Sequence, residues 1–236
     1  EIGADFASFV GKIYGEFDEQ TNVKRVQYNP EWPNYMCFDW GYVNPLAAIE
    51  FQVTPWDEIR VWREHYKSYT RLEEHIEQLK AREQPDGYKI DLCFGDAADP
   101  EAVASVNAHF APCLAMPEAK KNWRAGIEVV KGFLRMRPSG AVDEYGTPGE
   151  EPGLYVDHSC VNTIREFNTY RAPDTTGGPL VREKADRQDD HALDALRYGL
   201  VHLYSLGAQR HLSEVHEFSN SGLTDAGYFT LEGAQF

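Results

Sequence analysis

The centre of the predicted fold is the segment Tyr35-Met36-Cys37-Phe38-Asp39-Trp40-Gly41, an apolar run that ends in a carboxylate, an indole and a glycine. Such a run is typical of a buried β-strand that stops at a turn. Residues 46–53 and 58–66 predict two further strands, and the short links between the three favour antiparallel hairpins. A charged group at the end of an apolar strand is costly unless something pairs with it. Asp39 is therefore the first candidate functional residue.

Helices and strands alternate through the rest of the chain. The expected elements are a helix over 70–83, a strand over 88–96, a helix over 99–110, a strand over 113–116, a helix over 122–136, a strand over 154–156, and helices over 162–170 and 189–206. A helix that crosses between two strands implies that those strands pair in parallel. The order predicts an α/β fold with a mixed central sheet and helices on both faces.

Composition suggests the domain limits. We expect an arm or linker over 1–33, one domain over 34–206 and a C-terminal tail over 207–236, which has few aliphatic residues. Residues 138–153 hold four Gly and three Pro, which predicts a loop or hairpin insertion. The chain begins at Glu1 and not at Met, so we expect it to be part of a longer protein.

Charge and cysteine usage exclude several classes of protein. The 236 residues carry 38 acidic and 23 basic side chains, a formal net charge of −15. This balance argues against a nonspecific nucleic-acid coat, because phosphate contacts need Lys and Arg. It is compatible with a nuclease that gathers carboxylates around metal ions. No apolar run approaches the roughly 18 residues of a membrane span, the first residues given do not resemble a signal peptide, and no C-x-x-C pair indicates a zinc site.

Further carboxylates stand where a metal site could form. Asp96 continues the face of the 88–96 strand that carries Phe94, and Asp190 and Asp194 share one face of the last helix because they are four residues apart. Bringing such groups together is unfavourable through like-charge repulsion. Mg²⁺ or Mn²⁺, which prefer oxygen ligands, would remove that repulsion. Two such ions can activate water and stabilise the leaving oxygen of a phosphodiester.

Structural roles are the alternatives for these residues. The two strand-end aspartates could be turn residues. Asp189 and Asp190 could favour a helix N-terminus. Asp194 could form an i,i+3 pair with Arg197, and His191 is better interpreted as a hydrogen-bonding neighbour than as a ligand.

Three motifs together resemble the nuclease domain of viral large terminase subunits, the DNA-packaging motors of tailed phages. They are Phe38-Asp39-Trp40-Gly41, Gly95-Asp96-Ala97-Ala98-Asp99-Pro100 and Asp190-His191-Ala192-Leu193-Asp194-Ala195-Leu196-Arg197-Tyr198. The resemblance covers roughly residues 30–206. It implies an RNase H-like (retroviral-integrase-like) fold and a metal-dependent endonuclease. Such a domain cuts concatemeric double-stranded DNA at the initiation and termination of genome packaging by two-metal phosphodiester hydrolysis.

The resemblance also implies site residues and partners. The catalytic and metal-binding carboxylates would be Asp39, Asp96, Asp190 and Asp194, with two Mg²⁺ or Mn²⁺ ions, and which of the last two aspartates binds metal stays open. Asp189 and His191 are second-tier candidates. The implied partners are an N-terminal ATPase domain of the same polypeptide, the portal and the small terminase subunit, in the host cytoplasm. No Walker A motif occurs in this chain, so no ATPase activity is expected from it.

Basic side chains near the carboxylates predict a rim that tracks DNA phosphates, although ordinary solvated helix faces are the alternative. The rim residues are Lys120, Lys121, Arg124, Lys131, Arg182, Lys184 and Arg187. Such a rim binds DNA weakly, without sequence preference and with strong salt dependence. Two other functions stay open: an RNase H-like junction resolvase or transposase, and a module that mainly grips DNA and docks onto the portal.

Overall fold

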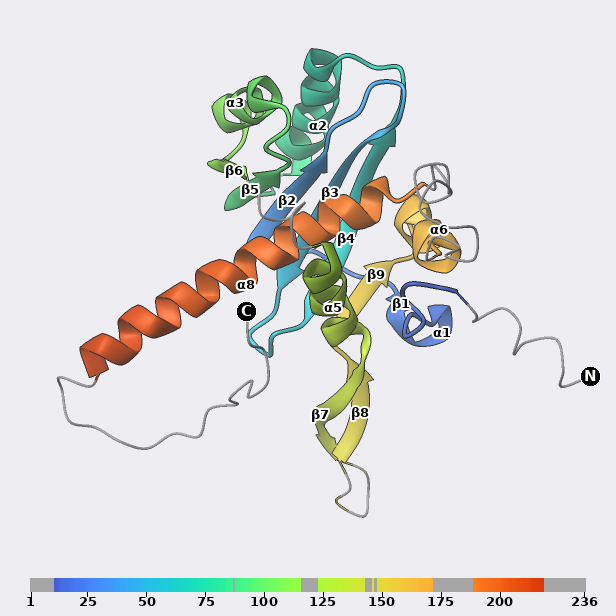
Figure 1. Ribbon diagram of the computed structural model, residues 1–236, viewed down its shortest axis with the longest axis vertical. Helices are drawn as coiled ribbons and strands as arrows, with labels where there is room; N and C mark the ends of the chain where they lie inside the picture. Colours follow the sequence, from blue (N-terminus) through green and yellow to red (C-terminus); the bar gives the residue numbers. More distant parts are fainter. Residues whose placement is uncertain are drawn as a thin grey trace, which may run out of the picture. The chain divides into compact units, whose positions relative to one another are not determined.

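The computed structural model describes residues 11–86, 88–115, 123–142, 146, 148–171 and 189–218. Within these residues a seven-stranded sheet has the order β1-β9-β4-β3-β2-β5-β6 (Figure 1). Its strands are β1 (Val23–Lys24), β2 (Asn34–Asp39), β3 (Leu46–Val53), β4 (Ile59–Lys67), β5 (Leu92–Gly95), β6 (Cys113–Ala115) and β9 (Leu154–Asp157). β2, β3 and β4 form an antiparallel meander, whereas β5 pairs in parallel with β2 and β9 in parallel with β4. The predicted mixed sheet is confirmed.

Helices cover both faces of this sheet (Figure 1). They are α1 (Glu19–Asn22), α2 (Leu72–Asp86), α3 (Pro100–His109), α5 (Trp123–Leu134), α6 (Val161–Thr169) and α8 (His191–Phe218). On one face, Leu79 of α2 and Val106 of α3 join Met36 in a buried apolar cluster. On the other face, α8 comes so close to β2 that a Cβ atom at Gly199 would overlap the sulfur of Cys37. Because both faces are covered, β3 is buried along nearly its whole length.

Two local expectations need correction. The last helix runs to Phe218 and not to residue 206, so the first part of the predicted tail is helical. Residues 11–33 are more than an extended arm, because they contain α1 and contribute β1 to the sheet edge beside β9. For 138–153 the hairpin alternative is the correct one, since β7 (Met136–Val142) and β8 (Pro148–Pro152) pair in an antiparallel ribbon.

No helix in the described part of the chain is long and apolar enough to cross a membrane.

Candidate functional site

Asp39 and Asp96 lie at one edge of the sheet. Asp39 ends β2 and Asp96 directly follows β5, and the two strands are parallel neighbours. Cys37 and Phe94 face α8, where Phe94 packs against His202 at a ring distance of 4.8 Å. Side chains two residues apart on a strand share a face. Both aspartates therefore lie on the α8 side of the sheet, and Asp96 shares the face of Phe94, as the sequence pattern predicted.

Trp40 holds the two strand ends together. Its Nε1 donates a hydrogen bond to the backbone carbonyl of Asp96 over 2.8 Å, and its ring stacks on Phe38 at 4.9 Å. A Cβ atom at Gly95 would lie 2.5 Å from the indole, so only glycine leaves room for the ring. The side chain of Asp96 is buried and accepts a hydrogen bond from the backbone N–H of Ala98 at 2.9 Å.

His191 links the end of β2 to the first turn of α8. Its Nδ1 lies 2.8 Å from Oδ2 of Asp39, and both side chains are about 15% exposed or less. Burial raises the pKa of Asp39; the hydrogen bond from His191 lowers it, and the charges of Asp194 and Asp96 raise it again. Burial lowers the pKa of His191, but the bond to Asp39 and the surrounding carboxylate charges together outweigh burial, so the net shift is upward. The contact is the hydrogen-bonding role expected for His191.

Asp190 and Asp194 occupy different environments although both lie at the start of α8. Burial and then the charge of Asp194 raise the pKa of Asp190 to about 6, while a hydrogen bond from Tyr170 lowers it. Asp194 accepts a hydrogen bond from Arg197 at 2.8 Å and one from Tyr198 at 3.4 Å. Arg197 is only 2% exposed and the Asp194 side chain 24%, so the predicted i,i+3 pair is a partly buried contact and does not lie on a solvated face. Asp194 thus already has a cationic partner.

Glu166 belongs to this region and was missed by the sequence patterns. It lies on α6, is fully buried, and its Oε1 accepts a hydrogen bond from the Tyr66 hydroxyl at 2.7 Å. Its Oε2 accepts from the backbone N–H groups of Ala192 and Leu193 at 2.8 and 3.1 Å. Burial raises the pKa of Glu166 to about 7, and these hydrogen bonds lower it. No sequence signal separates this glutamate from one that faces solvent.

The remaining predicted residues lie farther out or cannot be placed. Asp189 is exposed and lies 3.4 Å from Arg165. Arg124 is exposed, and its neighbour Trp123 hydrogen-bonds Tyr170, the residue that also bonds Asp190. Lys131 is already paired, with its Nζ 3.7 Å from a carboxylate oxygen of Glu128. The other predicted rim residues lie outside the described residues: Lys120, Lys121, Arg182, Lys184 and Arg187.

The donor chemistry of this edge suits a hard divalent cation. The charges of Asp194 and Asp96 raise the pKa of Asp39, and the charges of Asp194 and Asp39 raise that of Asp190, as acidic groups do when they share a small region. Oxygen ligands of this kind are those that Mg²⁺ and Mn²⁺ prefer. Among the described residues, no three His, Cys, Asp or Glu side chains are close enough to hold an ion as they stand. Binding of a metal would therefore need these side chains to draw closer.

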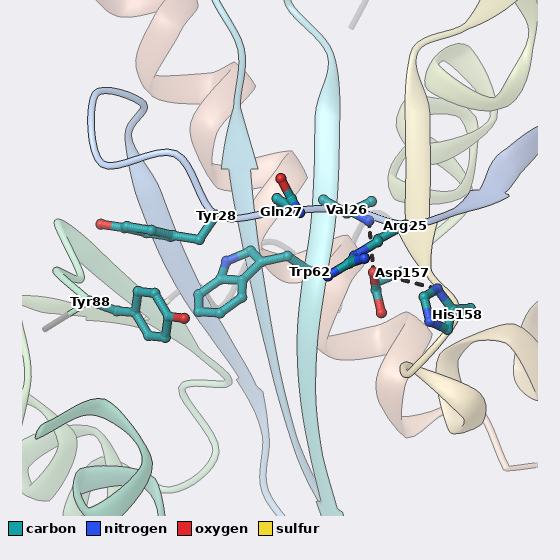
Figure 2. Close-up of a pocket in the computed structure, with 8 residues that line it drawn as sticks. All are labelled: Arg25, Val26, Gln27, Tyr28, Trp62, Tyr88, Asp157 and His158. Carbon is teal, nitrogen blue, oxygen red and sulfur yellow. Dashed lines mark hydrogen bonds and ion pairs between the residues drawn. The ribbon is translucent and has the colours of Figure 1, made fainter. Parts of the chain in front are cut away.

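A pocket in the described part of the chain is lined by none of these carboxylates. Figure 2 shows a pocket with the rings of Tyr28, Trp62 and Tyr88 at one end and Asp157 at the other. Trp62 is the extra residue of a β-bulge in β4, and its ring lies 5.2 Å from that of Tyr28 and 4.8 Å from that of Tyr88. Asp157 accepts a hydrogen bond from the backbone N–H of Val26 at 2.7 Å. Val26 and Asp157, which both line the pocket, are thus bonded to each other. None of the predicted site residues lines the pocket.

Comparison with known proteins supports the fold. No family model matches the chain, and no curated protein matches it significantly. Among solved structures, the chain is similar to the large terminase of a thermophilic bacteriophage, with TM-score 0.61 and 20% identity over 80% of this chain and 45% of that one. It is also similar to the P22 large terminase nuclease domain, with TM-score 0.58 and 17% identity over 81% of this chain and 92% of that one.

A third similar structure is the large terminase nuclease of thermophilic phage G20c with bound magnesium. The TM-score is 0.56 and the identity 11%, over 81% of this chain and 97% of that one. The chain spans less than half the length of the first of these three proteins but covers nearly all of the two nuclease domains. The chain therefore has the fold of large terminase nuclease domains, and the expected fold class is confirmed.

Proposed function

We propose that this chain is a metal-dependent DNA endonuclease of the large-terminase type, which cuts concatemeric double-stranded DNA at the start and end of genome packaging. One observation carries the proposal. Carboxylates from β2, β5 and the start of α8 lie near enough at one end of the sheet for their charges to act on Asp39, in a fold shared with terminase nuclease domains. Magnesium bound in the similar G20c nuclease agrees with the oxygen-rich donor set of this edge.

Asp39, Asp96 and Asp190 would hold one or two Mg²⁺ or Mn²⁺ ions. A bound divalent ion supplies activation of water and neutralisation of charge on the phosphodiester. We place Asp190 ahead of Asp194 because Asp194 already accepts a hydrogen bond from the buried Arg197. In this scheme the negative charge of Asp194 acts on Asp39 and Asp190 without Asp194 binding the metal. His191 fixes the orientation of Asp39.

The DNA backbone would be drawn to the site by Arg124 and by the basic residues that precede it in the sequence. Arg124 is exposed, and the Trp123–Tyr170–Asp190 contacts connect its helix to the carboxylates. Because the contacts are to phosphates, this binding would be independent of sequence and weakened by salt. In a packaging motor the ATPase domain, the portal and the small subunit would be the partners, in the host cytoplasm.

The test is a plasmid-cleavage assay with Mn²⁺, Mg²⁺ or EDTA, comparing wild type with Asp39→Asn. The matched control is Asp157→Asn, another strand-end aspartate, which lies in the pocket of Figure 2. We expect cutting with either metal, none in EDTA, loss in Asp39→Asn and retention in Asp157→Asn. Retained cutting by Asp39→Asn would remove Asp39 from the site.

The same assay separates the rival functions. A strong preference for branched DNA, or joining of strands, would favour a junction resolvase or a transposase. No cutting with any metal by a folded protein that still binds DNA would favour a gripping and docking module.

A further inference from the structure

The N-terminus of α8 is capped by a residue from a different helix. The first backbone N–H groups of a helix have no partner within it, and an aspartate directly before the helix usually accepts from the second or third of them. Asp190 stands at that position before His191, so Ala192 and Leu193 carry the N–H groups in question. Both donate to Oε2 of Glu166 instead, at 2.8 and 3.1 Å.

Glu166 is itself held in place from the sheet. The Tyr66 hydroxyl on β4 donates to its other oxygen at 2.7 Å. The helix that carries it, α6, has Cys160 before its first residue, and Cys160 makes no capping bond. Glu64 on β4 takes over that cap, accepting from the backbone N–H groups of Asn162 and Thr163 at 2.9 Å each. Two carboxylates thus connect β4 to α6 and α6 to α8.

We propose that Glu166 is a positioning residue that takes over the capping of α8 and thereby frees the carboxylate of Asp190 for metal binding. With the N–H groups of Ala192 and Leu193 occupied, the Asp190 side chain turns to Tyr170 and the neighbouring acidic groups. The metal role rests on the proposed function. The exchange of capping partners does not, because it concerns the metal-free protein.

A double-mutant cycle in metal-free buffer tests the exchange. In the wild-type background, Asp190→Ala should leave the unfolding equilibrium unchanged or shift it toward the folded state. In a Glu166→Ala background Asp190 becomes the cap, so adding Asp190→Ala should lower the folded-to-unfolded ratio about fivefold. Asp157→Ala is the control background, because it removes another buried carboxylate that accepts from backbone N–H groups. The effects of Asp157→Ala and Asp190→Ala on stability should simply add.

Equal effects of Asp190→Ala in the wild-type and Glu166→Ala backgrounds would overturn the exchange. If Glu166→Ala does not fold, Glu166→Asp serves in its place, because its shorter side chain cannot reach both N–H groups while staying bonded to Tyr66.

Calorimetric titration with Mn²⁺, without DNA, tests the consequence for the metal site. We expect Glu166→Ala to bind Mn²⁺ about tenfold more weakly than wild type, the range seen when a residue that orients a ligand is removed. Glu166→Gln should restore the affinity, because its amide oxygen can accept from both N–H groups while its NH₂ group bonds the Tyr66 oxygen.

Wild-type affinity in Glu166→Ala, or no rescue by Glu166→Gln, would overturn the positioning role. Absence of Mn²⁺ binding by the wild-type protein would instead overturn the proposed function, and the double-mutant cycle would still decide the exchange of caps.

Discussion

The indole nitrogen of Trp40 lies 2.8 Å from the backbone carbonyl oxygen of Asp96 and donates a hydrogen bond to it. The two residues are 56 positions apart in the chain but stand at the ends of neighbouring parallel strands. The contact sets the spacing between the segments that carry Asp39 and Asp96. A single aromatic side chain thereby joins two of the sequence motifs into one site.

Loss of this contact should impair both stability and the site. Trp40→Phe removes the hydrogen bond and should cost about 1 kcal/mol of unfolding free energy. Gly95→Ala should cost about 1–3 kcal/mol, because its new Cβ would lie 2.5 Å from the indole. Urea denaturation measures both. A Trp40→Phe/Gly95→Ala double mutant that loses the full sum of the two effects would contradict the shared contact, since the smaller ring leaves room for the methyl group.

The close approach of α8 to β2 depends on Gly199. A methyl group there would overlap the Cys37 sulfur and lie 3.1 Å from Phe51, so Gly199→Ala should destabilise the protein by about 1–3 kcal/mol. Gly132 on α5 is the matched control, because nothing lies within 4 Å of its added Cβ. Gly132→Ala should stabilise by up to about 1 kcal/mol through helix propensity. Thermal melts of the two variants should therefore shift in opposite directions, and equal shifts would refute the proximity of helix and strand.

Divalent metal should stabilise the folded protein in the proposed scheme. At about 100 times the dissociation constant, Mn²⁺ should add about 2.7 kcal/mol to the unfolding free energy, and EDTA should reverse the gain. Asp39→Asn should lose most of this gain. In EDTA the variant should be at least as stable as wild type, because burial penalises the charged form of Asp39. A full metal-dependent rise in the melting temperature of Asp39→Asn would argue against Asp39 as a ligand.

The basic rim should show itself in the salt dependence of DNA binding. Arg124→Ala should weaken binding and reduce the slope of log K against log salt by about 1, the loss of one phosphate contact. Lys131→Ala should have a smaller effect, because Glu128 already lies 3.7 Å from its Nζ. Lys80→Ala on α2, paired with Glu77 at 3.2 Å, is the control on a different helix. Fluorescence anisotropy at several salt concentrations measures all three, and an unchanged slope for Arg124→Ala would remove it from the rim.

A buried histidine pair should make the protein sensitive to acid. Nε2 of His65 lies 2.8 Å from Nδ1 of His75, and burial with the neighbouring charge of His75 lowers the pKa of His65 to about 4. The unfolded chain takes up this proton near pH 6.5 and the folded chain does not. The contribution of His65 is therefore complete above about pH 6.5 and is lost as the pH falls toward about 4.

The matching variant is His65→Gln. Between about pH 7.5 and 4.5, wild type should lose on the order of 1–2 kcal/mol more than this variant, after allowance for solvent screening. Chemical denaturation at the two pH values gives the difference. If the variant loses as much stability as wild type over this range, the folded protein takes up the proton on His65 as readily as the unfolded chain does, and the predicted lowering of its pKa is wrong.

Local pattern was enough to predict much of this protein. The apolar run before Asp39 marks a central strand, and the twofold alternation through Phe94 places Asp96 on the face of Phe94. The four-residue spacing of Asp190 and Asp194 likewise predicts one helix face. These features follow from the side-chain periodicity of single helices and strands, which depends only on residues close together in the sequence.

Contacts between distant elements could not be derived in this way. Glu166 reaches the start of α8 across 26 residues and Tyr66 across 100. The sequence around Glu166 does not indicate whether its side of α6 faces water or the end of another helix. Arg197 pairs with Asp194 and thereby gives it a cationic partner. The burial of Arg197 likewise depends on a distant element, because α5 packs over it at Gly126. Desolvation and the pairing of buried polar groups are properties of the packed whole, because each depends on which surfaces exclude water together.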